Sequence, residues 1–232
     1  MLGKIEASLN EKLTNVEWGE YKLGDLFSIK SSKKIFHASA LKVIYDTQIP
    51  NSLPYVVRMT SNNGIRGYIC ENVKYSNKGN SLSFAQDTFT VFYQENDFFT
   101  GNKVKVLYPL FNQKTPNVMK CFVACFKKTL ENYTWGTGST VNSIKEFIVY
   151  LPTKDGKIDF DFMESIIAEL EAYRIAELEA YLTVTGLKDT ELTAEEEKAL
   201  ENYNNITFKN FKLTNVFDVK NTGNILSRDI VE

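Results

Sequence analysis

Side chains that offer paired hydrogen-bond donors and acceptors gather in RMTSNNGIRGYI, residues 58–69, which follows an apolar run. Arg and Asn can each present two hydrogen-bonding atoms to the edge of one base, while Ser, Thr and glycine amides contact phosphates. Asn63-Gly64 is also a strong signal for a tight hairpin turn, and a turn alone accounts for such polar residues. The stretch therefore predicts either a nucleic-acid contact or a plain hairpin.

Three further connections have the same polar composition. They are SNKGNSLSFAQDT, FFTGNKVKV and WGTGSTVNS, at residues 76–88, 98–106 and 135–143. Each also has a plain structural interpretation, because Gly79-Asn80 is typical of a turn and Gln86 and Asp87 can satisfy neighbouring backbone groups. WGTGSTVNS contains Gly-x-Gly but precedes a strand, which favours a flexible connection over a phosphate-binding loop. No single loop decides the function.

Catalytic constellations are missing from the sequence. It has no P-loop, no methyltransferase Asn/Asp-Pro-Pro-aromatic motif and no Pro-Asp followed by Glu-x-Lys of nucleases. The only histidine, His37, has no recognisable catalytic partner beside it. Three cysteines, Cys70, Cys121 and Cys125, predict core thiols rather than a disulfide framework or a zinc site. We therefore expect no catalytic residues, no metal and no cofactor.

Composition predicts a folded protein with an uneven charge distribution. The chain has 232 residues, 43% of them hydrophobic, and can bury a substantial core. Its net charge is only −2, but residues 1–150 carry +6 and the remainder −8, which suggests an anionic partner for the first part and water or protein for the second. No apolar run approaches the roughly 20 residues that span a bilayer, so we expect a cytoplasmic protein without a membrane segment.

The polar loops must be positioned by strands and one helix. Residues 18–30 predict short strands around a turn at Gly24-Asp25. Apolar residues at helical spacing, with Pro116 near the start, predict a helix over 116–133. Segments rich in β-branched and aromatic residues predict further strands at 54–60, 87–94, 104–110 and 145–152. We expect an α+β fold, with a mixed, β-rich domain over residues 1–151.

The residue pattern of the chain changes after Pro152, from short strands to a long helical pattern. Residues 159–185 contain no glycine or proline, and Gly186 is placed to end a long helix of some 25 residues, roughly 37 Å in length. Within it AELEAY occurs twice with an eight-residue offset, which predicts packing on more than one side instead of a simple coiled-coil seam. Thr193 and Glu196 form a capping-box pattern that predicts the start of a second helix.

An internal repeat gives the domain organisation. Residues 15–35 align without gaps to residues 205–225, an offset far longer than a solenoid unit. We therefore expect a domain over 1–151, two helices over 152–204, and the truncated start of a second repeat over 205–232. On this interpretation the chain is slightly more than half of a two-repeat protein.

Taken in order along the chain, these pieces resemble a known family. WGEYKLGDLFSIKSSKK, PYVVRMTSNNGIRGYI, GNSLSFAQDTFTVFYQENDFFTGNKVKVL and GSTVNSIKEFIVYLP are similar to the specificity subunits of type I restriction-modification systems and to their relatives in bipartite type II enzymes. In that family two target recognition domains are separated by long helices that pack antiparallel. One departure is TKDGKIDFDFMESI after YLP, where many members continue with Pro-Leu and Glu-Gln.

The resemblance implies a non-catalytic recognition subunit that binds one half of a bipartite site on double-stranded DNA. It also implies docking to methyltransferase (modification) subunits, with a nuclease subunit in the restricting assembly. A second copy packing through residues 159–185 would make a homodimer that recognises a palindromic, gapped target. The candidate DNA-contacting residues are Arg58, Thr60, Ser61, Asn62, Asn63, Arg66, Asn77, Lys78, Asn80, Ser83, Gln86, Thr100, Asn102, Lys103, Ser139, Thr140 and Asn142.

Two other classes of function stay open at this point. One is a binding module whose aromatic and Asn-rich loops bind a carbohydrate or peptide. The other is the recognition fragment of a fused restriction-methylation enzyme. Steep salt dependence and sequence selectivity of binding would exclude the first, since a neutral ligand releases few counterions.

Overall fold

The structure is a computed structural model that describes residues 2–131, 140–188, 192–207, 209–212, 215, 217 and 218. Contacts divide the chain into two units, residues 1–181 and 182–232, which we describe separately. The division falls beyond the boundary at residue 151 that the sequence predicts, because Met163 and Ile166 of the following helix are buried in the core of the first unit.

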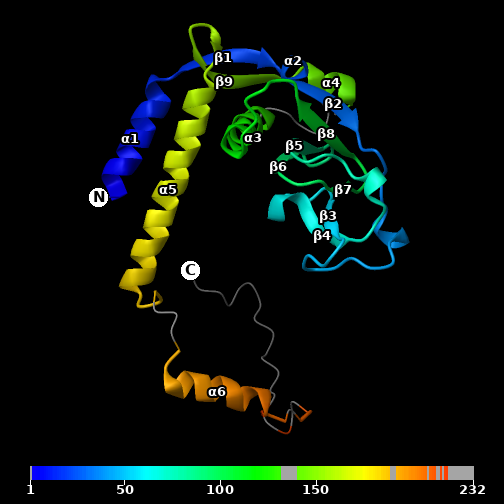
Figure 1. Cartoon of the computed structure of the whole chain (residues 1–232), viewed down its shortest axis with the longest axis vertical. Coiled ribbons are helices and arrows are strands. Elements are labelled where there is room, and N and C mark those ends of the chain that lie inside the picture. Colours follow the sequence, from blue (N-terminus) through cyan, green and yellow to red (C-terminus); the bar gives the residue numbers. More distant parts are fainter. Residues whose placement is uncertain are drawn as a thin grey trace, which may run out of the picture. The chain divides into compact units, whose positions relative to one another are not determined.

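A four-stranded antiparallel sheet forms the centre of the first unit (Figure 1). Its order is β2-β8-β5-β6, and the strands are β2 (Phe27–Ser31), β5 (Ser81–Ala85), β6 (Thr90–Gln94) and β8 (Val104–Pro109). Helix α3 (Pro116–Leu130) packs against β5 and β6. The α3 helix begins where the sequence predicts, with Thr115 as N-cap accepting from the Val118 amide and Pro116 in the first turn.

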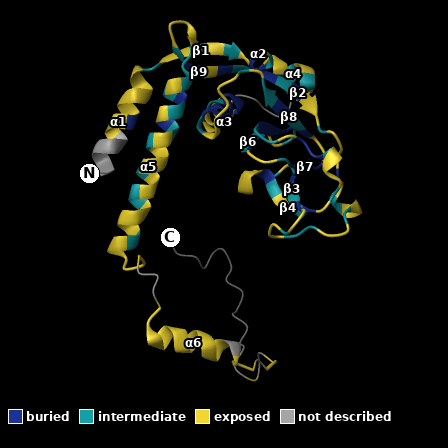
Figure 2. Ribbon diagram, in the orientation of Figure 1, coloured by how far each residue is buried: buried dark blue, intermediate teal, exposed yellow. Residues whose placement is uncertain are grey.

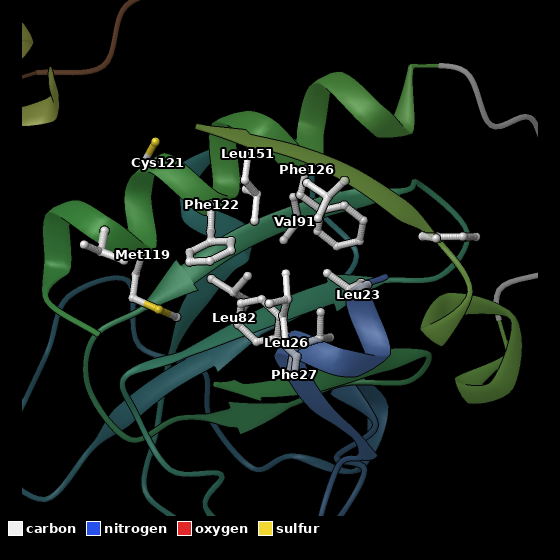
Figure 3. Packing of buried hydrophobic residues seen from close by; sticks show 14 of the residues in the cluster. Leu23, Leu26, Phe27, Leu82, Val91, Met119, Cys121, Phe122, Phe126 and Leu151 are labelled. Atoms are coloured by element: carbon white, nitrogen blue, oxygen red, sulfur yellow. The ribbon is translucent and has the colours of Figure 1, made fainter. Parts of the chain in front are cut away.

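Aromatic and aliphatic side chains between α3 and this sheet make the main core. Figure 3 shows Phe122 and Phe126 of α3 facing Leu82 and Phe27. Phe27 contacts Phe122 edge to face, with ring centroids 5.3 Å apart. Cys121 is buried here, whereas Cys70 is exposed, so the prediction that all three cysteines are core thiols is wrong for Cys70.

A second sheet is connected to one long helix before its first strand and to another after its last strand. Its order is β1-β9-β10, with strands β1 (Glu17–Lys22), β9 (Ile148–Lys154) and β10 (Lys157–Ile158). Helix α1 (Leu2–Asn15) leads into β1, and α5 (Phe160–Val184) follows β10, so the two helices lie side by side (Figure 1). Leu9 of α1 is buried, and Lys12 of α1 pairs with Glu169 of α5.

The third sheet of the described chain is smaller and carries the first polar loop. Its order is β4-β3-β7, with β3 (Leu53–Val56) antiparallel to β4 (Ile65–Ile69) and parallel to β7 (Phe99–Thr100). Its own core is Phe36, Tyr55, Ile69 and Phe99. Short helical turns complete the unit: α2 (Leu23–Leu26), η1 (Ala38–Ala40), η2 (Asn62–Gly64), η3 (Val73–Tyr75) and α4 (Val141–Lys145).

The predicted long helix is confirmed as α5, 25 residues long. Its first turn is capped by Asp159, whose carboxylate accepts from the Phe162 amide at 2.9 Å. Gly186 follows with a φ of 73°, the left-handed conformation that ends helices. Figure 2 shows buried residues near the start of α5 and mostly exposed ones toward its end.

The second unit contains α6 (Ala194–Asn204). The predicted capping box is confirmed, since Thr193 and Glu196 each accept from the other's backbone amide. At the 190-residue offset of the sequence repeat, α6 corresponds in position to α1, because Asn205 after α6 aligns with Asn15 at the end of α1. The sequence analysis predicted no helix at α1, although Leu2, Glu6 and Glu11 recur as Leu192, Glu196 and Glu201.

Candidate nucleic-acid interface

Three of the four predicted loops meet at one carboxylate. Asp87, in the turn between β5 and β6, accepts from Arg58 Nη1 of the loop after β3. Lys103, just before β8, donates from Nζ to both carboxylate oxygens of Asp87 at 3.1 Å. The backbone adds a further link, because the Gln86 amide donates to the Lys103 carbonyl at 3.0 Å. We call Arg58, Asp87 and Lys103 the loop cluster.

The loop over residues 57–64 runs beside β6, the outer strand of the four-stranded sheet. The Thr90 hydroxyl donates to the Met59 carbonyl at one end of the loop. At the other end Asn63 Nδ2 donates to the Tyr93 carbonyl at 2.8 Å, and Gln94 Nε2 donates to the Asn63 carbonyl at 2.9 Å. These bonds occupy polar groups of β6 and fix the loop on a rigid base.

The tight turn in this loop lies one residue before the predicted Asn63-Gly64 pair. Its central residues are Asn62 and Asn63, with φ of 48° and 51°, and the Gly64 amide donates to the Ser61 carbonyl at 2.9 Å. Gly64 then has a φ of 74°, and a Cβ there would lie 3.2 Å from the Phe92 ring. β3 and β4 are joined by eight residues instead of a two-residue hairpin, because Val56 pairs with Ile65.

Several predicted residues are exposed around this turn. Asn62 is exposed but its Nδ2 donates to the Ile65 carbonyl at 2.7 Å, so part of its hydrogen-bonding capacity stabilises the turn. Within the ranges that the structure describes, Arg66 makes no ion pair and its side chain is exposed. Thr60, Ser61 and Asn102 are exposed as well.

Three predicted residues are buried and hold the fold together. Asn77 donates to the Phe98 carbonyl and accepts from the Lys33 amide, Ser83 accepts from Gln94 Nε2, and Thr100 donates to the Lys34 carbonyl. Their exposed fractions are 1%, 2% and 0%. Such side chains cannot reach DNA without local unfolding, so we leave them out of the proposed contact set.

Lys78 and Asn80 lie at the other end of β6, near the β6–β7 connection. Asp97 accepts from Lys78 Nζ at 2.8 Å and from the Gly79 amide at 2.9 Å. Asn80 donates to the Lys114 carbonyl at 3.0 Å and accepts from the Tyr93 hydroxyl at 3.2 Å. Both hydrogen-bonding ends of Asn80 are therefore engaged, while Lys78 is exposed above Asp97.

The fourth loop is not part of the loop cluster. Ser139 lies outside the described residues, and Thr140 is the N-cap of α4, accepting from the Ser143 amide at 3.2 Å. Asn142 is exposed on α4, which packs against α2 and β2. Gln86 lies beside Asp87 and is half-buried.

The electrostatics of the loop cluster favour a charged Asp87. Partial desolvation raises the pKa of Asp87, but hydrogen bonds and positive charge from Lys103 and Arg58 outweigh it and bring the pKa below its ordinary value. The carboxylate side chain is 25% exposed, against 41% for Arg58 and 51% for Lys103. The cations therefore face solvent while their partner lies deeper. The sequence analysis did not select Asp87, because an acidic residue is an unexpected choice beside a polyanion.

The described residues contain neither a metal cluster nor a membrane-spanning helix. No group of three or more His, Cys, Asp or Glu among them is arranged to hold a metal ion. Within the same ranges, no helix combines the length and apolar character needed to cross a bilayer.

A family model for the type I restriction modification DNA specificity domain matches residues 15–180. The chain belongs to this family. It is therefore a target-recognition specificity domain of restriction-modification systems, a non-catalytic module, as the sequence resemblance implied. The match begins at the end of α1 and includes the three sheets, α3 and most of α5.

Individual relatives of this specificity domain are distant. The Type II restriction enzyme BgcI specificity subunit S.BcgI of Heyndrickxia coagulans is 24% identical over 161 residues, covering 68% of this chain and 45% of the relative. The chain thus spans about half the length of the relatives that it matches.

Two solved structures, with TM-scores of 0.50 and 0.51, show the same fold. The HsdS subunit from Thermoanaerobacter tengcongensis matches with a TM-score of 0.50 and 12% identity, covering 87% of this chain and 50% of that one. A chain from a type I R-M system studied for complex assembly and conformational transition matches with a TM-score of 0.51 and 11% identity, covering 79% and 48%. The S subunit from M. genitalium has a TM-score of 0.48 and 16% identity, covering 79% and 49%.

Proposed function

We propose that this chain recognises one half of a bipartite site on double-stranded DNA and directs methyltransferase (modification) subunits, with a nuclease subunit in the restricting assembly, to that site. The observation that carries the proposal is the meeting of loops 57–64, 86–89 and 101–103 in a protein of the specificity-domain family. Sequence-specific binding needs several side chains held together on a rigid frame, and these loops are joined to each other and to β6.

Contacts of two kinds follow from side-chain chemistry. Arg66, Asn102 and Asn62 offer the paired hydrogen-bonding atoms that distinguish base edges in the major groove. Lys103, Lys78, Thr60 and Ser61 suit phosphate oxygens. Arg58 and Asn63 have partners within the fold, so their contributions include positioning the loops.

A homodimer through the 159–185 segment is part of the proposal. Leu170, Ile175, Leu178 and Tyr181 of α5 are 42–60% exposed. At 100° per residue these four side chains fall within an arc of about 140° on one side of the helix. An antiparallel second copy would cover this arc and place two recognition units in a twofold arrangement, which matches a gapped palindrome.

Selection from a randomised duplex library tests DNA recognition. The full chain is immobilised, incubated with the library at a series of salt concentrations, and the retained duplexes are sequenced. We expect enrichment of one sequence pattern, with affinity that falls steeply as salt rises. Retention that is independent of sequence at every salt concentration would contradict the proposal.

A further inference from the structure

We propose that Asp87 is a positioning residue for target selection: its carboxylate holds Arg58 and Lys103 in the arrangement that meets the DNA target. This inference rests on the proposed DNA recognition and adds a residue to it. An acidic side chain in a DNA-facing surface costs affinity through repulsion of phosphates. Its presence at the junction of three loops therefore calls for a compensating role.

The contacts of Asp87 supply such a role. Its two oxygens accept from Lys103 Nζ, both at 3.1 Å, and one of them also accepts from Arg58 Nη1. The two cations come from connections separated by more than forty residues of sequence. A single carboxylate thus fixes the relative position of two long, exposed side chains.

The turn that carries Asp87 is itself held from both sides. The Gln86 amide donates to the Lys103 carbonyl, and Phe89 packs edge to face on buried Phe84, with ring centroids 6.0 Å apart. Phe89 and Lys103 both adopt left-handed backbone conformations, with φ of 50° and 58°. Asp87 is therefore presented by a fixed backbone, as a positioning residue requires.

The Asp87 carboxylate should raise selectivity between DNA sequences by preordering the two cations, and its negative charge should lower the affinity for DNA of any sequence. Long side chains lose rotamer freedom on binding, and this loss is smaller when a neighbour already holds them in place. In contrast, the Asp87 charge weakens attraction to any duplex and neutralises part of the charge on its partners. Removing that charge should raise affinity for arbitrary DNA while lowering discrimination between DNA sequences.

The test compares the full wild-type chain with Asp87→Asn, using the duplex enriched from the library and a scrambled duplex of equal composition. We expect the ratio of the two affinities to fall about tenfold, which corresponds to about 1.4 kcal/mol. We expect binding to the scrambled duplex to tighten, and its salt dependence to steepen by roughly one counterion as a cation is released to phosphate. Asp87→Glu should restore most of the ratio because it keeps the carboxylate.

Asp155→Asn is the matched control. Asp155 is exposed in the β9–β10 turn with a φ of 52°, where Asn is tolerated, so it loses the same charge away from the loops. We expect both affinities in this variant to equal those of the wild type.

Four outcomes overturn the inference. Equal loss of both affinities with a lower melting temperature in Asp87→Asn would make Asp87 only structural. An equal rise in both would make it only a repulsive charge. If the wild type selects a sequence but Asp87→Asn leaves the ratio of the two affinities unchanged, Asp87 has no role in target selection. If the wild type selects no sequence, the proposed function and this inference are both overturned.

Discussion

At the scale of single residues, the candidate interface separates side chains that maintain the fold from side chains that are available to a ligand. Asn63 is exposed, yet both its side-chain amide and its carbonyl are bonded to β6. Arg66, three residues later on β4, is exposed and has no ion pair in the described chain. Residue type alone did not distinguish the two roles, because both types suit base recognition.

Arg66 should contribute directly to affinity for the target. A bidentate arginine contact discriminates by about 1–3 kcal/mol, so Arg66→Ala should weaken binding to the selected duplex by roughly 5- to 150-fold. Fluorescence anisotropy measures this change. Lys157→Ala, which removes an exposed positive charge from β10, outside the loop cluster and outside α5, serves as the control and should bind DNA as the wild type does. Unchanged affinity in Arg66→Ala would remove Arg66 from the interface.

Asn63 should act mainly through the turn. Asn63→Gly keeps the left-handed backbone accessible, so it should lose only the side-chain bond, about 1 kcal/mol of unfolding free energy. Asn63→Ala adds roughly another 1 kcal/mol of backbone strain. Urea unfolding gives both values. If Asn63→Gly folds with little loss but selects no sequence, Asn63 reads a base, and the turn is not its main role.

Asp97 should make the stability of the first unit depend on acidity. Desolvation raises the pKa of Asp97, but bonds from Lys78, the Gly79 amide and Ser76 outweigh it, so the folded pKa lies below the ordinary value. A depressed pKa stabilises the fold above the unfolded pKa of about 3.9, and this contribution disappears as the pH falls through the folded value. The stability difference between wild type and Asp97→Asn should shrink between pH 5 and pH 3, as measured by urea unfolding. A difference that is constant over this range would contradict the assignment.

At the scale of elements, three connections become one site because the strands that carry them are neighbours in space. β5, β6 and β8 are adjacent in the four-stranded sheet, so the β5–β6 turn and the residues before β8 lie at the same end. The loop after β3 joins them through its bonds to β6 and Asp87. The edge of β6 that bonds to the loop after β3 and the loop cluster therefore form one continuous site.

The sequence predicted the individual helices better than it predicted the contacts between distant loops. Local periodicity predicts α3, α5 and α6, because an apolar stripe and a cap depend on residues close together in the chain. The sequence analysis selected Asn77, Ser83 and Thr100 as DNA-contacting residues. Their burial depends on partners distant in sequence, such as Gln94 and Phe98, so no local pattern could show it. The role of Asp87 depends on two other loops and left no local signal.

Capping of α5 should be measurable as an element-scale contribution. Asp159 accepts from the Phe162 amide, so Asp159→Ala should lower the unfolding free energy by about 1 kcal/mol, whereas Asp159→Ser should retain most of it. Thermal unfolding followed by circular dichroism compares the two. Equal melting temperatures for wild type and Asp159→Ala would show that the cap does not stabilise the helix.

At the scale of the whole molecule, the repeat and α5 favour assembly of two copies. The sequence of residues 15–35 recurs at residues 205–225, which predicts that a second repeat begins there. The apolar side chains on the later part of α5 are exposed, whereas Met163 and Ile166 in its first turns are buried. A helix with such a face gains stability when another helix covers it.

The proposed dimer should depend on this face of α5. Light scattering at micromolar concentration should give twice the chain mass for the wild type, whereas Leu178→Asp should give the monomer. Ala180→Asp introduces the same charge on the side of α5 away from the arc and should remain dimeric. A monomeric wild type at high micromolar concentration would contradict the dimer.

Methylation profiling tests the central claim most directly. The chain is expressed together with its modification subunit in cells that lack other DNA methyltransferases, and modified adenines are mapped across the genome. We predict methylation at a single gapped motif with inverted half-sites, and loss of that motif when the chain carries Arg66→Ala and Asp87→Asn together. Methylation without a common motif, or the same motif when the chain is omitted, would contradict the account.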